Sequence, residues 1–214
     1  MTVKRHRVGM VANDPLRIVG LQALLEERVE IVALTAPGTL HDDGLSMIIL
    51  HEGSTGEIFP LIAAFRRARP LLPVLVVGES RDQGYIQKII AGGARGYLSE
   101  TARLDEIQMA IEVVKDGSVW APRKVLARLI DAPIEPQAPP DPVFTPRESE
   151  VLELLLAGRS NREIALSLKI DAATVKVHVS RLLQKTGVPN RVALTVRTLR
   201  RKAALAPDKQ AENF

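Results

Sequence analysis

The chain contains no cysteine and no long apolar run, and each absence excludes a class of protein. Without cysteine among 214 residues, disulfides and thiolate metal sites are excluded, which fits a cytoplasmic protein. No uninterrupted apolar run approaches the roughly 20 residues that a membrane-spanning helix needs. The basic start, Met1–Arg7, precedes an apolar run that already ends at Asn13, which is too short for a secretion signal. We therefore expect a cytoplasmic protein without a membrane partner.

The clearest pattern that is present lies at Asp171–Lys185, where the spacing predicts an uninterrupted amphipathic helix. Asp171 is a favoured N-cap residue, and one helical face gathers an apolar stripe of Val175, Val179, Leu182 and Leu183. The opposite face and its flanks are cationic and hydrogen-bonding, with one aliphatic side chain at the centre: Thr174, Lys176, Val177, Ser180, Arg181 and Gln184. Such a face suits the major groove of DNA, where cations reach guanines or phosphates and an aliphatic group touches a thymine methyl.

Residues on both sides of this helix predict a helix-turn-helix with two supporting helices. Ser160 with Glu163 and Thr145 with Glu148 have the spacing of capping boxes, which start two shorter helices upstream. Asn190 can cap a fourth helix downstream. Its apolar stripe is longer than so small a core requires, which indicates a dimer seam at Val192, Val196 and Leu199.

The stretch from Thr145 to Arg191 resembles the DNA-binding domain of the LuxR/NarL (GerE-type, FixJ-like) regulators, with several linked motifs in order. The resemblance implies that Lys176 and Val177 approach bases. It places Asn161, Thr174 and Arg191 near the DNA backbone or the caps of the domain. Ser180 departs from the family, because many members carry lysine there, and the change removes a cationic contact.

Charge follows the same division of the chain. The net charge is +4, but residues 144–214 hold 13 basic and 7 acidic residues, whereas the remainder holds 16 and 18. The cationic excess therefore lies in the segment assigned to DNA. We expect a domain at 1–130, a proline-rich linker at 131–143, the helix-turn-helix domain at 144–205 and a tail at 206–214.

The first 130 residues alternate short apolar runs with helical patterns, which predicts an α/β fold with a doubly wound, five-stranded parallel sheet. The expected strands are 8–12, 31–35, 47–50, 74–77 and 96–98, and the expected helices are 15–28, 57–69, 83–91 and 104–115. The segment 36–45 is too short and too rich in Gly, Pro and Asp for a further helix.

This half resembles the flavodoxin-like receiver domain of response regulators through Pro15, Gly20-Leu21, the segment Gly92–Leu98 and Gly117–Trp120. A working receiver needs carboxylates for Mg²⁺, an acceptor aspartate, a hydroxyl and a lysine. The matching positions hold none of these, so the pocket is predicted to be degenerate: Ala12, Asn13, His51, Gly78 and Glu100. Asp14 and Glu52 lie one residue further along, which in a strand means the opposite face.

Other candidate sites are weaker. His41, Asp42, Asp43, His51 and Glu52 could form a hard-metal site, but their spacing is not diagnostic. We therefore expect no metal and no cofactor. No nucleophile and base are paired, so an enzyme is not expected.

The sequence as a whole predicts a DNA-binding transcriptional regulator that acts as a homodimer on a promoter or operator, independently of phosphorylation. RNA polymerase or a partner regulatory protein would be a further partner. The alternative is an adaptor or antagonist that uses the degenerate receiver to capture a protein, with DNA binding secondary.

Overall fold

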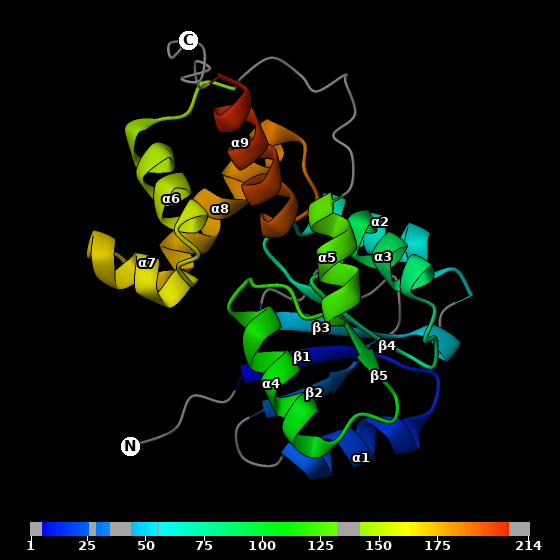
Figure 1. The fold of residues 1–214 in the computed structure, drawn as a ribbon. Helices are drawn as coiled ribbons and strands as arrows, with labels where there is room; N and C mark the ends of the chain where they lie inside the picture. Colours follow the sequence, from blue (N-terminus) through cyan, green and yellow to red (C-terminus); the bar gives the residue numbers. More distant parts are fainter. Residues whose placement is uncertain (1–5, 26–28, 35–43, 55, 132–141, 206–214) are drawn as a thin grey trace.

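A computed structural model of the chain describes residues 6–25, 29–34, 44–54, 56–131 and 142–205. Its first part, residues 6–131, is an α/β half built on one parallel sheet (Figure 1). The strands are β1 (His6–Val11), β2 (Val29–Ala33), β3 (Leu45–His51), β4 (Val74–Gly78) and β5 (Gly96–Ser99). They are arranged in the order β2-β1-β3-β4-β5. This is the predicted five-stranded, doubly wound fold.

Helices cover both faces of the sheet because its strands are apolar on both sides. Met47 and Ile49 of β3 pack with α1 (Pro15–Leu25) and α4 (Leu104–Lys115). Ile48 and Leu50 point to the other face and pack with α2 (Ile58–Ala68) and α3 (Gln83–Gly92). The carboxyl ends of the strands thus form one edge, where a doubly wound fold places its functional crevice.

Two elements of this half were not predicted. A short 3-10 turn, η3 (Glu52–Ser54), follows β3 directly, and helix α5 (Arg123–Asp131) precedes the proline-rich segment. Helix α5 is only nine residues long and buries Val125 alone, so its periodicity is brief. The expected strands and helices otherwise agree with the observed ones to within a few residues. The segment 36–45, except its end, and the candidates His41, Asp42 and Asp43 lie outside the described residues.

The second part, residues 142–205, is a helical half. It contains α6 (Pro146–Leu156), α7 (Asn161–Leu168), α8 (Ala172–Thr186) and α9 (Arg191–Leu205) around a single apolar core. Both predicted capping boxes form: Ser160 Oγ accepts from the Glu163 amide at 3.3 Å, and Glu163 Oε2 accepts from the Ser160 amide at 2.7 Å. Asn190 caps α9 by accepting from the Ala193 amide at 3.0 Å. Asp171 occupies the N-cap position of α8 but makes no capping side-chain bond.

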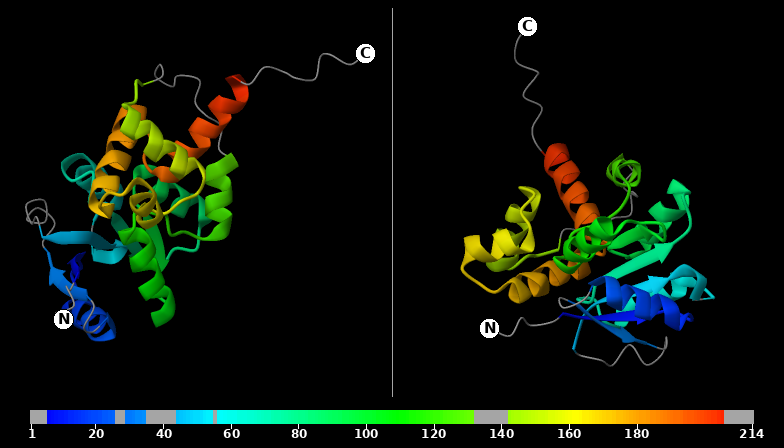
Figure 2. Two further views of the ribbon diagram at one scale, coloured as in Figure 1. Left: turned by 90° about the vertical axis from the view of Figure 1, so that its left-hand side faces the viewer. Right: turned by 90° about the horizontal axis from the view of Figure 1, so that it is seen from below.

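The two halves pack against each other. Helix α9 lies beside α5, and α7 and α8 lie over the end of the α/β half that carries α4 and the loop after it (Figures 1 and 2). Among the described residues, no helix is long and apolar enough to cross a membrane.

Candidate nucleic-acid interface

Helix α8 has the two-sided character that the sequence predicted. Val175, Val179, Leu182 and Leu183 are buried in the core of the helical half. On the other face Thr174, Arg181 and Gln184 are exposed, whereas Lys176 and Val177 are half-buried. Turns on either side position the helix: Lys169 adopts a left-handed φ of 54° between α7 and α8, and Gly187 ends α8 with a φ of 70°.

Ser180 differs from its expected position on an open surface. Its exposed fraction is 6%, because it faces the α/β half and lines a small gap there with Pro70, Arg95 and Lys176. The helical spacing correctly placed Ser180 opposite the apolar stripe. It could not indicate that a second layer of protein covers that face.

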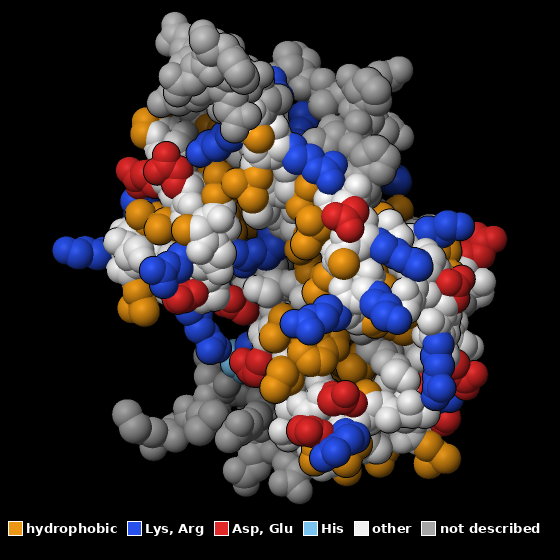
Figure 3. Space-filling view, in the orientation of Figure 1, with side chains coloured by type: hydrophobic (Ala, Val, Ile, Leu, Met, Phe, Trp, Pro, Cys, Tyr) orange, Lys and Arg blue, Asp and Glu red, His pale blue; other side chains and the backbone are white. Residues whose placement is uncertain are grey.

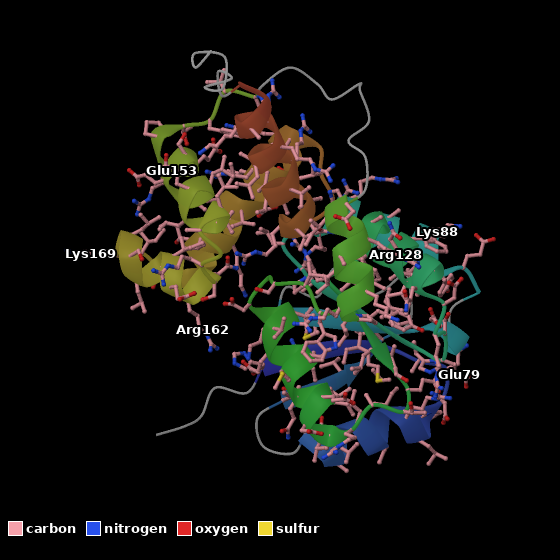
Figure 4. All side chains as sticks on the ribbon, viewed as in Figure 1. Glu79, Lys88, Arg128, Glu153, Arg162 and Lys169 are labelled. Atoms are coloured by element: carbon pink, nitrogen blue, oxygen red, sulfur yellow. The ribbon has the colours of Figure 1, made fainter. Side chains whose placement is uncertain are left out.

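Lys176 lies in a crowded electrostatic environment. Burial lowers the pKa of its ammonium group, the nearby Lys115 and Arg162 lower it further, and Asp116 opposes the shift. Arg162, at the end of α7 nearer the α/β half, forms an ion pair with Glu112 at 3.5 Å (Figure 4). Lys176 of α8 therefore lies near Asp116, and Arg162 of α7 pairs with Glu112, both carboxylates of the α/β half.

Asn161 and Arg191 were expected to lie near the DNA backbone. In the structure they form hydrogen bonds with residues of the α/β half. The Asn161 amide donates to Asp116 Oδ2 at 3.3 Å, and its side-chain Nδ2 donates to the Asp116 carbonyl. Arg191 donates to Ser118 Oγ at 3.4 Å and to the Arg159 carbonyl at 2.7 Å. Both side chains are buried. The structure thus describes a closed arrangement in which several predicted DNA contacts face protein.

The predicted seam on α9 is partly covered. Val192 and Val196 are half-buried, while the exposed fraction of Leu199 is 48%. Helix α9 also contacts α5, and Arg200 donates to the Ile130 carbonyl there. The later turns of α9 are therefore held against α5 of the α/β half.

The crevice at the carboxyl edge of the sheet contains an internal ion-paired cluster. His51 is buried, with an exposed fraction of 4%, and its Nε2 lies 2.5 Å from both Arg17 Nη1 and Glu100 Oε1. Arg17 also pairs with Glu100 at 3.0 Å. Burial of Glu100 opposes its ionisation, but hydrogen bonds from Arg17 and His51 outweigh it and lower the pKa of the carboxyl group. The cation at this edge is Arg17, which the sequence did not single out.

Glu52 lies on the opposite face of the sheet from His51, as strand alternation predicts, although β3 ends at His51 and Glu52 begins η3. His51 lies with Ile49 and Leu98 on the α1 and α4 face, whereas Glu52 contacts Tyr97 in the core on the α2 and α3 face. The Glu52 side chain therefore does not point toward the acceptor position. Its Oε2 accepts from the Tyr97 hydroxyl at 3.2 Å. It also lies only 1.8 Å from where a Cβ on Gly78 would stand. Because Gly78 has no side chain, the Glu52 carboxylate can occupy this space.

The remaining predicted pocket positions, Ala12 and Asn13, follow β1 directly. Ala12 is half-buried after β1, and Asn13 is exposed. Asp14 caps the start of α1 by accepting from the Leu16 amide at 2.9 Å, and it lies 3.6 Å from Arg17 Nε. No group of three His, Asp or Glu side chains within the described ranges is arranged to hold a metal ion.

Comparison with known proteins places the chain among bacterial regulators. The family described as bacterial regulatory proteins, luxR family, matches residues 142–198. The transcriptional regulatory protein MctR of Rhizobium johnstonii is 32% identical over 197 residues, covering 88% of this chain and 90% of the relative. The nitrate/nitrite response regulator NarP of Escherichia coli is 30% identical over 209 residues, covering 92% and 96%.

Solved structures resemble the chain in fold. RcsB from Salmonella enterica serovar Typhimurium, determined bound to a promoter, matches with a TM-score of 0.50 and 20% identity, covering 90% of this chain and 97% of that one. At this identity the likeness concerns the fold alone.

Proposed function

Because the chain belongs to the LuxR family of bacterial response regulators, we propose that it is a transcriptional regulator that reads promoter DNA through α8 as a homodimer. The observation that carries this proposal is the helix-turn-helix of α7 and α8. Its core side is apolar and buried, and its other side carries Thr174, Lys176, Val177, Arg181 and Gln184. A cationic and hydrogen-bonding face that points away from the core has no role within that core, whereas a major groove complements it.

Roles on DNA follow from side-chain chemistry and position. Lys176 and Val177 lie near the start of α8, where a recognition helix approaches base edges. Thr174, Asn161 and Arg191 carry donors suited to phosphate oxygens, and Ser180, Arg181 and Gln184 extend the contact along the helix. Phosphate contacts would supply affinity that falls with salt, and base contacts would supply sequence preference.

DNA and the α/β half compete for the same face of α8. Asn161 and Arg191 already bond to Asp116 and Ser118, and Ser180 is buried against the α/β half. These side chains cannot contact DNA at the same time. We therefore infer that the DNA-bound form requires the two halves to separate, and that only the separated form binds an operator with full affinity.

Control of this opening does not require phosphorylation. His51 provides an imidazole at the acceptor position, and Glu100 supplies a negative charge where a phosphoryl group needs a positive one. Arg17 is already engaged by Glu100, Asp14 and His51. An incoming phosphoryl group would have to displace these contacts before it gained any.

The adaptor alternative has one observation in its favour. Helix α1 leaves apolar side chains uncovered, with exposed fractions of 79% for Leu16 and 64% for Val19, and such residues favour a protein contact. Salt-dependent binding to a defined operator separates the two functions, because an adaptor would not bind one DNA sequence specifically.

The test is a genome-wide footprint of the tagged protein, followed by binding of the purified chain to the site found. Lys176→Ala and Val177→Ala should each weaken that binding about tenfold to a hundredfold, since a good specific contact contributes about 1–3 kcal/mol. Lys88→Ala is the matched control, because Lys88 is exposed on α3, away from α8 (Figure 4). Normal binding by both α8 variants would show that another surface reads the DNA.

A further inference from the structure

A cavity with a volume of about 240 Å³ lies between the two halves, and basic side chains line one side of it. The α/β half contributes Arg66 and Arg67 from α2 and Arg95 from the turn before β5. Helix α8 contributes Ser180 and Gln184. The remaining wall is largely apolar and includes Ile62, Leu72 and Leu183. Three guanidinium groups of the α/β half and two neutral hydrogen-bonding side chains of the helical half therefore line the same cavity.

These guanidinium groups lack a balancing anion. None of the ion pairs found within the described residues includes Arg66, Arg67 or Arg95. Arg95 donates instead to the neutral Gly117 carbonyl at 3.4 Å. Burial lowers the pKa of Arg95 to about 10, and the positive charges of Arg191 and Arg66 add to the shift. Arg95 is half-buried, and a partly desolvated cation beside like charges is stabilised when an anion joins it.

Basic side chains are abundant along this boundary. Figure 3 shows Lys and Arg side chains on both sides of the line where the helical half meets the α/β half. Asp116 and Glu112, which face the helical half, are engaged elsewhere: Asp116 by Asn161 and Glu112 by Lys115 and Arg162. Neither of these carboxylates lines the cavity.

The shape of the groups indicates which anion fits. A guanidinium group presents paired N–H donors that match the oxygens of a phosphate, and several together favour a dianion. The Ser180 hydroxyl and the Gln184 amide can donate from the opposite wall. The volume equals that of about eight waters at roughly 30 Å³ each, which leaves room for a few carbon atoms beside a phosphate. The apolar wall at Ile62, Leu72 and Leu183 would contact those carbons.

We propose that this cavity is a binding site for a small phosphomonoester, whose phosphate dianion is held by Arg66, Arg67 and Arg95 and reached by Ser180 and Gln184. Because the ligand contacts both halves, its binding stabilises the closed arrangement. It therefore weakens DNA binding, and by linkage DNA weakens ligand binding by the same factor. This second consequence rests on the proposed function, whereas ligand binding itself does not.

The binding test uses isothermal titration calorimetry on the full chain without DNA, with glycerol 3-phosphate as the probe. We expect saturable binding, weakened about tenfold or more in Arg66→Gln and Arg67→Gln, because each loses a charge-assisted contact. Both residues are exposed, so neither change threatens folding. Arg66→Lys should lose less than Arg66→Gln, and Lys88→Gln, which removes the same charge elsewhere, should bind normally.

Two calorimetric results would contradict a binding site in this cavity. Equal binding by the wild type and Arg66→Gln, or no saturation at millimolar probe, would refute it. Inorganic phosphate at matched ionic strength is the second arm. Affinity equal to that of glycerol 3-phosphate would overturn the assignment of an organic ligand, and weaker binding supports it.

The effect of the ligand on DNA binding is tested separately, with the operator found by footprinting. Saturating glycerol 3-phosphate should weaken operator binding of the wild type severalfold and leave that of Arg66→Gln unchanged. Ligand binding with no effect on operator affinity would overturn the coupling but not the site. Failure to find an operator would contradict the proposed function and leave the calorimetric result standing.

Discussion

Single residues determine much of the stability of the helical half and the charge of the crevice in the α/β half. Glu148 is buried, with an exposed fraction of 2%, and its Oε2 accepts from Lys185 Nζ at 2.6 Å and from the Thr145 amide at 2.9 Å. It therefore serves as both the capping residue of α6 and the ionic partner of α8. The two roles can be separated, because glutamine retains the cap but not the charge.

Glu148→Gln should lower the free energy of unfolding by about 1.5–3 kcal/mol, the contribution of a hydrogen bond to a charged group. Glu150→Gln removes the partly exposed pair with Arg147 at 2.6 Å and should cost under about 1 kcal/mol. Urea denaturation measures both. Equal losses would show that the buried pair contributes no more than a surface one.

Glu148 should also make the free energy of unfolding depend on pH. The Lys185 hydrogen bond is the main cause that lowers the pKa of Glu148 in the folded state below its ordinary 4.5. A lowered folded pKa contributes stability that is fully present above the ordinary pKa and is lost as pH falls through the folded pKa. The stability difference between wild type and Glu148→Gln should therefore persist from neutral pH to about 5 and shrink in more acidic buffer. A difference that grows on acidification would reverse the assigned sign.

At the crevice, small phosphodonors with Mg²⁺ should neither label the protein nor change its operator affinity. Ala12 offers no metal ligand, and Glu100 repels an incoming phosphoryl group. Intact-mass spectrometry after acetyl phosphate treatment measures the labelling. Stoichiometric modification at His51 or Glu52 with tighter operator binding would contradict phosphorylation independence.

At the scale of elements, the contact between α4 and the start of α7 holds the closed arrangement. Asp116 follows α4 directly and accepts from Asn161. Asp116→Ala should weaken this contact by about 1–2 kcal/mol, which corresponds to a fivefold to thirtyfold gain in the open fraction and in operator affinity.

Fluorescence anisotropy on labelled operator measures that gain, and small-angle scattering measures the accompanying expansion. Asp105→Ala is the control. Asp105 lies in the first turn of α4, where it is exposed and pairs with Arg103 at 3.2 Å. Tighter operator binding by the control as well would indicate a general charge effect. Unchanged binding by Asp116→Ala would show that this contact does not limit opening.

At the scale of the whole molecule, we expect a dimer that does not depend on phosphorylation, with a second contact along Val192, Val196 and Leu199 on DNA. Two-fold symmetry would then appear as two half-sites in a pseudo-palindromic operator. Leu199→Glu should reduce cooperative binding to both half-sites while leaving a single half-site occupied. Leu199 is the exposed member of the stripe, so the helical half should still fold. Sedimentation that shows only monomers at micromolar concentration, with an unrepeated half-site in footprints, would contradict this expectation.

Local patterns in the sequence were sufficient for most of the elements. The strands β1–β5, helices α1–α4 and α6–α9, both capping boxes and the cap at Asn190 follow from periodicity and from hydrogen bonds within a few residues. Helix α5 was not found, because one buried side chain in nine residues leaves little periodic pattern. The opposite orientations of His51 and Glu52 followed from strand alternation.

The sequence by itself determined the fold class and the helix-turn-helix, because each depends on residue identity and short spacing. Only the tertiary structure decided which surfaces meet. It brought Arg17 to His51 and Glu100 across the carboxyl edge of the sheet, and it turned Ser180 toward Arg95. It also set Asn161 against Asp116. Contacts between residues 34 to 85 positions apart depend on how whole elements pack, and no helical or strand period extends over that distance.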